Sequence, residues 1–102
     1  MSGYVLSRPG EKDLDEIWEY IAADSVEAAD RLIGKLFDAF EDLARNPGLG
    51  HTRKDLTRRP VLFWPVGRYL VIYRASRRLL EIVGIAHGSR HIPAFLHGRA
   101  AE

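Results

Sequence analysis

The sequence predicts a single α+β domain in which two helices cover one face of an antiparallel sheet. Three observations indicate this class: a short β-prone segment opens the chain, two segments with helical periodicity follow, and β-branched and aromatic segments fill the second half. The chain has 102 residues, close to the commonest domain size, and neither a linker nor an internal repeat divides it. We therefore expect one domain over residues 1–102.

The first half of the chain predicts a strand followed by a helical hairpin. Residues 4–6 are β-prone, and residues 7–12, which include a proline and a glycine, predict a turn. From Asp13 onward apolar residues recur with helical spacing. Asp24, with a glutamate three residues later, resembles a capping box at the start of a second, longer helix. An Asn-Pro-Gly sequence at 46–48 ends it, and the short connection predicts antiparallel helices.

The second half predicts a three-stranded antiparallel sheet. Residues 61–64 form an apolar segment between two prolines, which favours an edge strand because proline lacks a ladder donor. Residues 69–73 and 79–86 predict two further strands, joined by a hairpin turn at 75–78. The expected architecture is an N-terminal strand, a two-helix antiparallel hairpin and then this three-stranded sheet.

The predicted strands are apolar on both faces. Tyr69, Val71 and Tyr73 alternate with Leu70 and Ile72, so neither set of side chains is polar. Two helices can cover one face of the sheet, which leaves the other to a different cover. We expect a partner protein to bury that second face. The alternative is that the apolar C-terminal tail folds back over it.

Charge is divided unevenly between the two halves of the chain. Residues 1–50 hold 11 acidic and 5 basic residues, a balance of −6, whereas residues 51–102 hold 3 acidic and 10 basic residues, a balance of +7. These balances give the net charge of +1 for the whole chain. Such an asymmetry indicates an anionic partner for the basic half.

The sequence excludes several kinds of chemistry. It has no cysteine, and so no disulfide, thiol nucleophile or cysteine-ligated metal. No segment is long and apolar enough for a membrane span, and the N-terminus does not resemble a signal peptide. His87 and His91 are four residues apart, but the pattern lacks the glutamate of a zinc motif, and no glycine-rich nucleotide loop is present. We expect neither a metal nor a cofactor.

Arginine is the most informative residue type for a binding site. If the strands pair in sequence order, several arginines converge at one end or face of the sheet, where guanidinium groups can hold phosphate or carboxylate. The alternative interpretation is ordinary solubilising charge. The residues predicted to contact a partner or target are Arg58, Arg59, Trp64, Arg68, Tyr73, Arg74, Arg90, His91 and Phe95.

Five segments in this order resemble the ParE toxins of the RelE/ParE superfamily of toxin–antitoxin and plasmid-stabilisation proteins. The resemblance covers nearly the whole chain, and the order and spacing of the segments carry it. They are Y-V-L-S at 4–7, D-L-x-x-I-x-x-Y-I at 13–21, L-x-x-N-P-x-x-G at 43–50, G-R-Y-x-V-x-Y-R at 67–74 and I-x-H-G-x-R at 85–90.

The resemblance implies a toxin that inhibits DNA gyrase in the bacterial cytoplasm. It also implies a ParD-like antitoxin, whose ribbon-helix-helix half dimerises and binds operator DNA while its C-terminal half wraps the toxin. The toxin would then contact operator DNA indirectly, through the antitoxin. We expect the antitoxin segment to be acidic and amphipathic, to cover the second sheet face and to contact the arginines of the basic half.

Two other functions remain open. A RelE-like endoribonuclease that cuts messenger RNA on translating ribosomes would use Arg68, Arg90, His87 and His91 as catalytic residues. Such a site often includes a C-terminal tyrosine or histidine, and the nearest tail aromatic here is Phe95, which cannot exchange a proton. The incomplete set favours the non-enzymatic, gyrase-binding toxin. The third possibility is a toxin homologue without toxicity that serves in a binding or regulatory complex.

Overall fold

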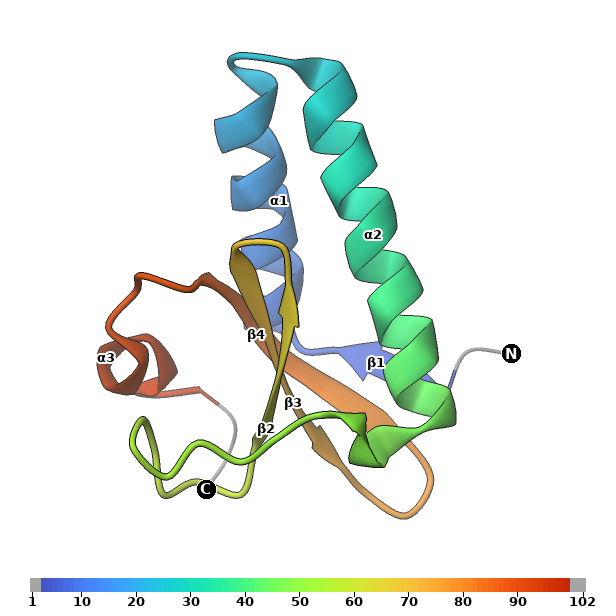
Figure 1. The fold of residues 1–102 in the computed structure, drawn as a ribbon, viewed down its shortest axis with the longest axis vertical. Helices are drawn as coiled ribbons and strands as arrows, with labels where there is room; N and C mark the ends of the chain where they lie inside the picture. Colours follow the sequence, from blue (N-terminus) through green and yellow to red (C-terminus); the bar gives the residue numbers. More distant parts are fainter. Residues whose placement is uncertain (1–2, 100–102) are drawn as a thin grey trace.

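The computed structural model describes residues 3–99, in which a helical hairpin packs on one face of a four-stranded sheet and a short helix lies on the other (Figure 1). This arrangement confirms the predicted α+β class. The elements in chain order are β1 (Tyr4–Leu6), α1 (Arg8–Ala22), α2 (Val26–Arg45), the 3-10 helix η1 (Pro47–Leu49), β2 (Leu62–Val66), β3 (Tyr69–Ala75), β4 (Leu80–His87) and α3 (Ile92–Leu96).

The sheet has the strand order β1-β4-β3-β2 and is mixed rather than purely antiparallel. β1 pairs in parallel with β4, from Tyr4 opposite Leu80 to Leu6 opposite Ile82, while the other two pairings are antiparallel. The sequence predicted β1 as a strand but did not place it in the sheet, where it pairs with β4 and makes a fourth strand. β2 lies at the edge as predicted, and this position tolerates Pro65.

Both long helices begin with a serine cap. α1 starts at Arg8, and Ser7 Oγ accepts a hydrogen bond from the Gly10 N–H at 3.0 Å. The prediction of a turn at 7–12 is thus wrong, because most of this segment forms the first turn of α1. A proline is tolerated there because a backbone N–H at this position would have no partner within the helix. Ser25, rather than Asp24, caps α2 and accepts from the Ala28 N–H at 3.1 Å.

The helix face of the sheet holds the larger apolar core. Leu36, Phe40 and Leu43 of α2 are fully buried against β3 and β4. Tyr73 is buried among them, and its hydroxyl donates to the Pro47 carbonyl at 2.7 Å and accepts from the Gly50 N–H at 2.8 Å. These two hydrogen bonds connect the segment after α2 to the centre of the sheet.

The second sheet face is covered by the chain itself. α3 packs its three apolar side chains against the sheet, and the expectation that a partner protein buries this face is therefore wrong. The C-terminal tail folds back because a short bend after β4 returns the chain and because its apolar residues match those of the sheet. The buried residues of this second core are Val61, Phe63, Ile72, Val83, Ala86, Ile92, Phe95 and Leu96.

Candidate functional site

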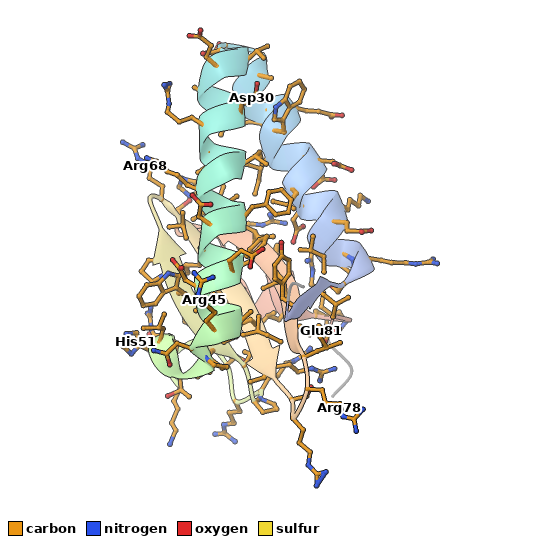
Figure 2. The ribbon with its side chains drawn as sticks, turned by 90° about the vertical axis from the view of Figure 1, so that its right-hand side faces the viewer. Asp30, Arg45, His51, Arg68, Arg78 and Glu81 are labelled. Atoms are coloured by element: carbon orange, nitrogen blue, oxygen red, sulfur yellow. The ribbon has the colours of Figure 1, made fainter. Side chains whose placement is uncertain are left out.

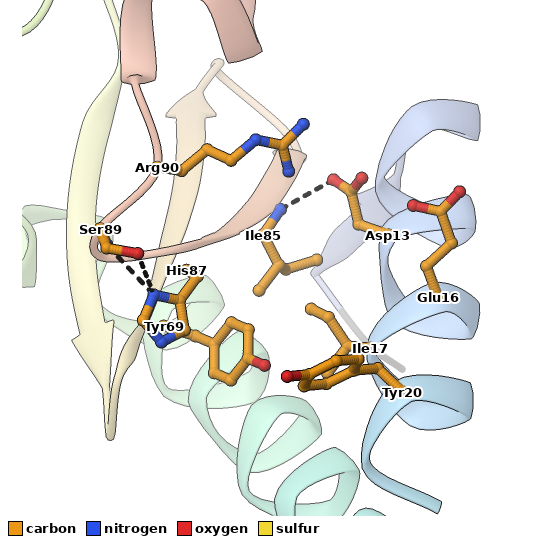
Figure 3. A pocket seen from close by; sticks show the side chains of 9 residues that line it. All are labelled: Asp13, Glu16, Ile17, Tyr20, Tyr69, Ile85, His87, Ser89 and Arg90. Carbon is orange, nitrogen blue, oxygen red and sulfur yellow. Dashed lines mark hydrogen bonds between the residues drawn. The ribbon is translucent and has the colours of Figure 1, made fainter. Parts of the chain in front are cut away.

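A cleft of about 400 Å³ opens between α1 and the end of β4 (Figure 3). Ile17 of α1 and Ile85 of β4 are buried apolar residues that line it. Polar and aromatic side chains from α1, β3, β4 and the following segment surround them. The complete lining is Asp13, Glu16, Ile17, Tyr20, Tyr69, Ile85, His87, Ser89 and Arg90.

The short length of β1 creates this arrangement. β1 pairs with β4 as far as Ile82, so the next residues of β4 have side chains of the α1 region as neighbours. Ser7 Oγ donates to the Val83 carbonyl at 3.0 Å, and the Ile85 N–H donates to Asp13 Oδ2 at 3.0 Å. Polar groups around α1 thereby satisfy the edge of β4, and α1 becomes one wall of the cleft.

Asp13 forms a partly buried ion pair with Arg99, which we call the Asp13–Arg99 clasp. Arg99 donates two hydrogen bonds to the carboxylate, at 2.7 and 3.0 Å, and its guanidinium carbon lies 3.9 Å from the centroid of the Phe95 ring. A Cβ at Gly84 would come within 3.0 Å of all three side chains, so glycine is needed there. The clasp pairs the negative charge of Asp13 with the positive charge of Arg99.

Two tyrosines border the lower part of the cleft in Figure 3, and their hydroxyl groups point toward each other. Tyr20 is 79% exposed. Burial, and next the neighbouring Tyr20, raise the pKa of the Tyr69 hydroxyl above its ordinary value near 10. Tyr69 therefore stays protonated at neutral pH.

His87 is held in place by Ser89 and Tyr69. Its Nδ1 atom accepts from the Ser89 N–H at 3.1 Å and lies 2.8 Å from Ser89 Oγ, and its ring meets that of Tyr69 edge-on at 5.3 Å. Because Nδ1 accepts the backbone N–H, a neutral His87 ring carries its proton on Nε2.

The four residues of the endoribonuclease alternative gather at one end of the sheet. His87 and Arg90 line the cleft, and the exposed Arg68 is brought close because its carbonyl accepts from the Gly88 N–H at 2.7 Å. His91 lies at the start of α3, where its Nδ1 accepts from the backbone N–H of the third residue on, at 3.4 Å. The sequence thus predicted this convergence correctly for part of the arginine set.

The other predicted arginines lie elsewhere. Arg74 forms an ion pair with Glu81 at 2.8 Å. Arg59 donates to the Arg99 carbonyl, and Arg58 is exposed in the preceding loop.

The two turns of the antiparallel strands also separate the basic residues. Figure 2 shows Arg68 and Arg78 at opposite ends of the sheet, since one lies in the β2–β3 turn and the other in the β3–β4 turn. Arg74, the predicted arginine next to the β3–β4 turn, therefore lies at the other end of the sheet from Arg68, and the predicted set does not form one continuous patch.

The three aromatic residues predicted for partner contact contribute to the two cores. Tyr73 and Phe95 are buried, one on each sheet face, so neither is offered at the surface. Trp64 is half-buried and packs against the larger core. Their apolar surface stabilises the fold.

Sequence reasoning missed the α1 side of the cleft. Glu16 and Tyr20 are absent from the predicted site residues, and Tyr69 was predicted only as part of a strand. The available signal was spacing: Glu16 and Tyr20 are four residues apart on one helical face. Nothing local indicated that this face adjoins the end of β4.

The described part of the chain offers no group of three or more histidine, aspartate or glutamate side chains placed to hold a metal ion. Within residues 3–99, no helix combines the length and apolar character that crossing a bilayer requires.

The fold and the site define a small α+β domain with a charged, partly aromatic cleft at the end of its sheet. Residues 4–92 match the family model of the ParE toxin of type II toxin–antitoxin systems, parDE, and the chain belongs to this family. Toxin ParE1 of Caulobacter vibrioides is 34% identical over 97 residues, which cover 94% of this chain and 99% of the relative.

Two further proteins are similar to the chain. Y4kP of Sinorhizobium fredii is 31% identical over 83 residues, which cover 81% of this chain and 84% of the relative. A solved structure of the chromosomal ParDE toxin–antitoxin system from P. aeruginosa superposes with a TM-score of 0.70 at 18% identity, covering 85% of this chain and 96% of the other. At that identity, the structural match shows a shared fold.

Proposed function

We propose that this ParE-family protein arrests growth by binding DNA gyrase and that a ParD-like antitoxin neutralises it in the bacterial cytoplasm. Similarity to Toxin ParE1 along almost the entire length of both chains supports a toxin with the activity of this branch. The proposal is that the protein is a binding toxin and not a nuclease. The basis for this distinction is the set of side chains at the end of the sheet where β4 ends.

The observation that favours binding over RNA cleavage is the burial of Phe95. Attack by an RNA 2′-hydroxyl needs a base, an acid and charge stabilisation together. Arg68 and Arg90 can stabilise charge, but the tail aromatic is a phenylalanine enclosed in the second core. Tyr69 cannot replace it as a base at neutral pH, because its pKa is raised.

The two histidines do not complete the nuclease set convincingly. His87 uses Nδ1 for Ser89, and His91 uses Nδ1 at the start of α3. Each imidazole therefore commits one ring nitrogen to local structure, and neither has a carboxylate partner among the described residues to orient it. This arrangement supports a surface that binds.

The antitoxin in this proposal has a ribbon-helix-helix half that binds operator DNA and an acidic C-terminal half that binds the toxin. The balance of +7 in residues 51–102 supports an acidic partner, because opposite charge speeds association. Contact between this toxin and operator DNA is then indirect. A pair of this kind stabilises the plasmid or chromosome region that encodes it.

The test uses purified protein, free of antitoxin, in two parallel assays. We expect it to inhibit supercoiling by DNA gyrase and to leave messenger RNA intact on translating ribosomes, as mapped by 5′ ends. Codon-specific cleavage that Arg68→Ala or Arg90→Ala abolishes would overturn the proposal in favour of the endoribonuclease.

A third outcome concerns toxicity itself. Induced expression without antitoxin is expected to stop growth. Normal growth at verified soluble levels would identify the non-toxic homologue instead and contradict the proposed gyrase inhibition.

A further inference from the structure

The structure leaves less surface for a partner than the sequence predicts, because the second sheet face is already covered. The tail closes the second sheet face, and the two long helices close the first. The cleft between α1 and the end of β4 remains open, and the exposed aromatic ring of Tyr20 lies beside it. An antitoxin segment must therefore bind somewhere other than the central sheet faces.

We propose that this cleft is the docking site for an antitoxin segment that carries a bulky apolar side chain next to a carboxylate. The inference rests on the proposed antitoxin partner and assigns the place and the chemistry of its contact. The apolar side chain lies against Ile17, Ile85 and Tyr20, and the carboxylate faces Arg90.

The shape of the cleft suits a side chain that acts as an anchor. Its volume of about 400 Å³ lies within the usual range for small-ligand sites, about 300–1,000 Å³. Ile17 and Ile85 provide an apolar surface that is already formed, while Tyr20 is free to cover the inserted group. Tyrosine is among the residue types most often found as binding hot spots when a partner buries it at the centre of an interface.

The charges of the cleft favour a carboxylate. The clasp with Arg99 neutralises Asp13, so this carboxylate does not repel an incoming anion. Arg90 has no ion-pair partner among residues 3–99, and its guanidinium carbon lies 5.1 Å from the Phe95 ring centroid. Arg68 lies at the same end of the sheet. A carboxylate beside Arg90 would gain a charge-assisted hydrogen bond.

The α1 wall argues against nucleic acid as the occupant. Asp15, Glu16 and Glu19 are exposed along this helix, and Glu16 faces the cleft with Lys12 at 4.0 Å as its partner. A chain of phosphates would meet the carboxylate of Glu16 in the cleft and those of Asp15 and Glu19 on the same helix. A peptide with a single carboxylate next to an apolar side chain can place its charge at Arg90 and avoid the wall.

The experiment measures the affinity of the antitoxin encoded beside the toxin gene by calorimetry. Arg90→Glu in the cleft is compared with Arg77→Glu, the same charge change at the exposed β3–β4 turn on the opposite end of the sheet. We expect Arg90→Glu to raise Kd at least about tenfold and Arg77→Glu to change it less than about threefold. Equal effects of the two substitutions would overturn the proposal.

Tyr20→Ala gives an independent measurement at the apolar contact. Because Tyr20 is 79% exposed, this substitution is expected to leave the thermal midpoint unchanged. It should raise Kd about tenfold. Wild-type affinity in both Tyr20→Ala and Arg90→Glu would place the antitoxin elsewhere and overturn the proposal.

Two controls separate the remaining occupants and the underlying function. Sedimentation of the isolated toxin tests whether a second copy occupies the cleft, and titration with a single-stranded oligonucleotide tests a nucleic acid. If either one occupies the cleft and Arg90→Glu leaves the affinity for antitoxin unchanged, the inference is contradicted. Gyrase inhibition by the wild-type toxin is measured in parallel. Its absence would defeat the proposed function while the affinity data still decide whether the cleft binds antitoxin.

Discussion

The two faces of the sheet are closed by covers of very different size. On one face, α1 and α2 contribute 15 and 20 residues, and their apolar side chains form a continuous core with β3 and β4. On the other, α3 has five residues and is joined by a loop that contributes Val61. The smaller cover is held by the partly buried Asp13–Arg99 clasp as well as by apolar contact.

The difference indicates how a short tail can be fixed in place. A helix of five residues does not persist alone in water, since helices below about 12 residues are marginal. Arg99 connects this tail to α1 by two hydrogen bonds to Asp13 and stacks on Phe95. The long helices bury a much larger apolar surface against the sheet. We therefore expect apolar substitutions to affect the first face most and polar substitutions to affect the second.

The largest effect is expected from Phe40→Ala on the helix face. Phe40 is fully buried, and removing its ring leaves a cavity between α2 and the sheet. The free energy of unfolding should fall by about 3–5 kcal/mol. Urea denaturation followed by circular dichroism measures this, and a loss below about 1 kcal/mol would show that α2 does not form the core described above.

Asp13→Ala should have the next largest effect, through the clasp. It removes the partner of Arg99 and leaves the Ile85 N–H without its acceptor. We expect a loss of about 2–4 kcal/mol, somewhat reduced by the partial exposure of Arg99.

A double-mutant cycle with Arg99→Gln isolates the coupling between the two side chains. The combined loss should be clearly smaller than the sum of the single losses. Strict additivity would mean that Asp13 and Arg99 do not stabilise the tail together.

Tyr73→Phe tests a polar link within the larger core. The change removes a donor to the Pro47 carbonyl and an acceptor for the Gly50 N–H, so a loss of about 1–3 kcal/mol is expected. Chemical denaturation at pH 7 provides the value. A neutral effect would indicate that apolar packing alone holds the segment after α2.

The same tyrosine makes stability depend on pH. Burial raises the pKa of the Tyr73 hydroxyl in the folded protein above its ordinary value near 10. Its contribution is therefore fully present below about pH 10 and is lost as pH rises through the folded pKa. Denaturation curves between pH 8 and pH 12 should show this decline in the wild type and a weaker one in Tyr73→Phe.

The smallest effect is expected from Arg45→Ala on the outer surface of α2. Arg45 pairs with Asp42 at 2.7 Å, but both side chains are exposed, so solvent screens the pair. The free energy of unfolding should change by less than about 1 kcal/mol. A larger loss would require a contact of Arg45 beyond this surface pair.

Periodicity was sufficient to predict most of the architecture. The two long helices and the β3–β4 hairpin follow from spacing within each segment, and the edge position of β2 follows from its prolines. The start of α1 was missed because Pro9 and Gly10 are typical of turns as well as of a first helical turn. The pairing of β1 with β4 depends on residues about 75 positions apart, which no local pattern encodes.

The site was harder to predict for the same reason. Asp13 looks like one more acidic residue on an amphipathic helix, and its burial depends on Arg99, 86 positions away. Tyr20 and Tyr69 come together because α1 runs beside the part of β4 that β1 does not pair with. Arg90 and His87 were predicted because they follow a recognisable strand.

Hydrogen exchange on the isolated protein tests most directly whether the chain itself closes the second sheet face. We expect the amides of Phe95 and Ile85 to exchange far more slowly than those of an unstructured peptide, with no partner present. Asp13→Ala should accelerate both while Val71 in the larger core remains slow. If residues 92–99 of the wild type exchange at the rates of an unstructured peptide, the chain does not close the second sheet face by itself. A partner protein would then be needed to cover that face.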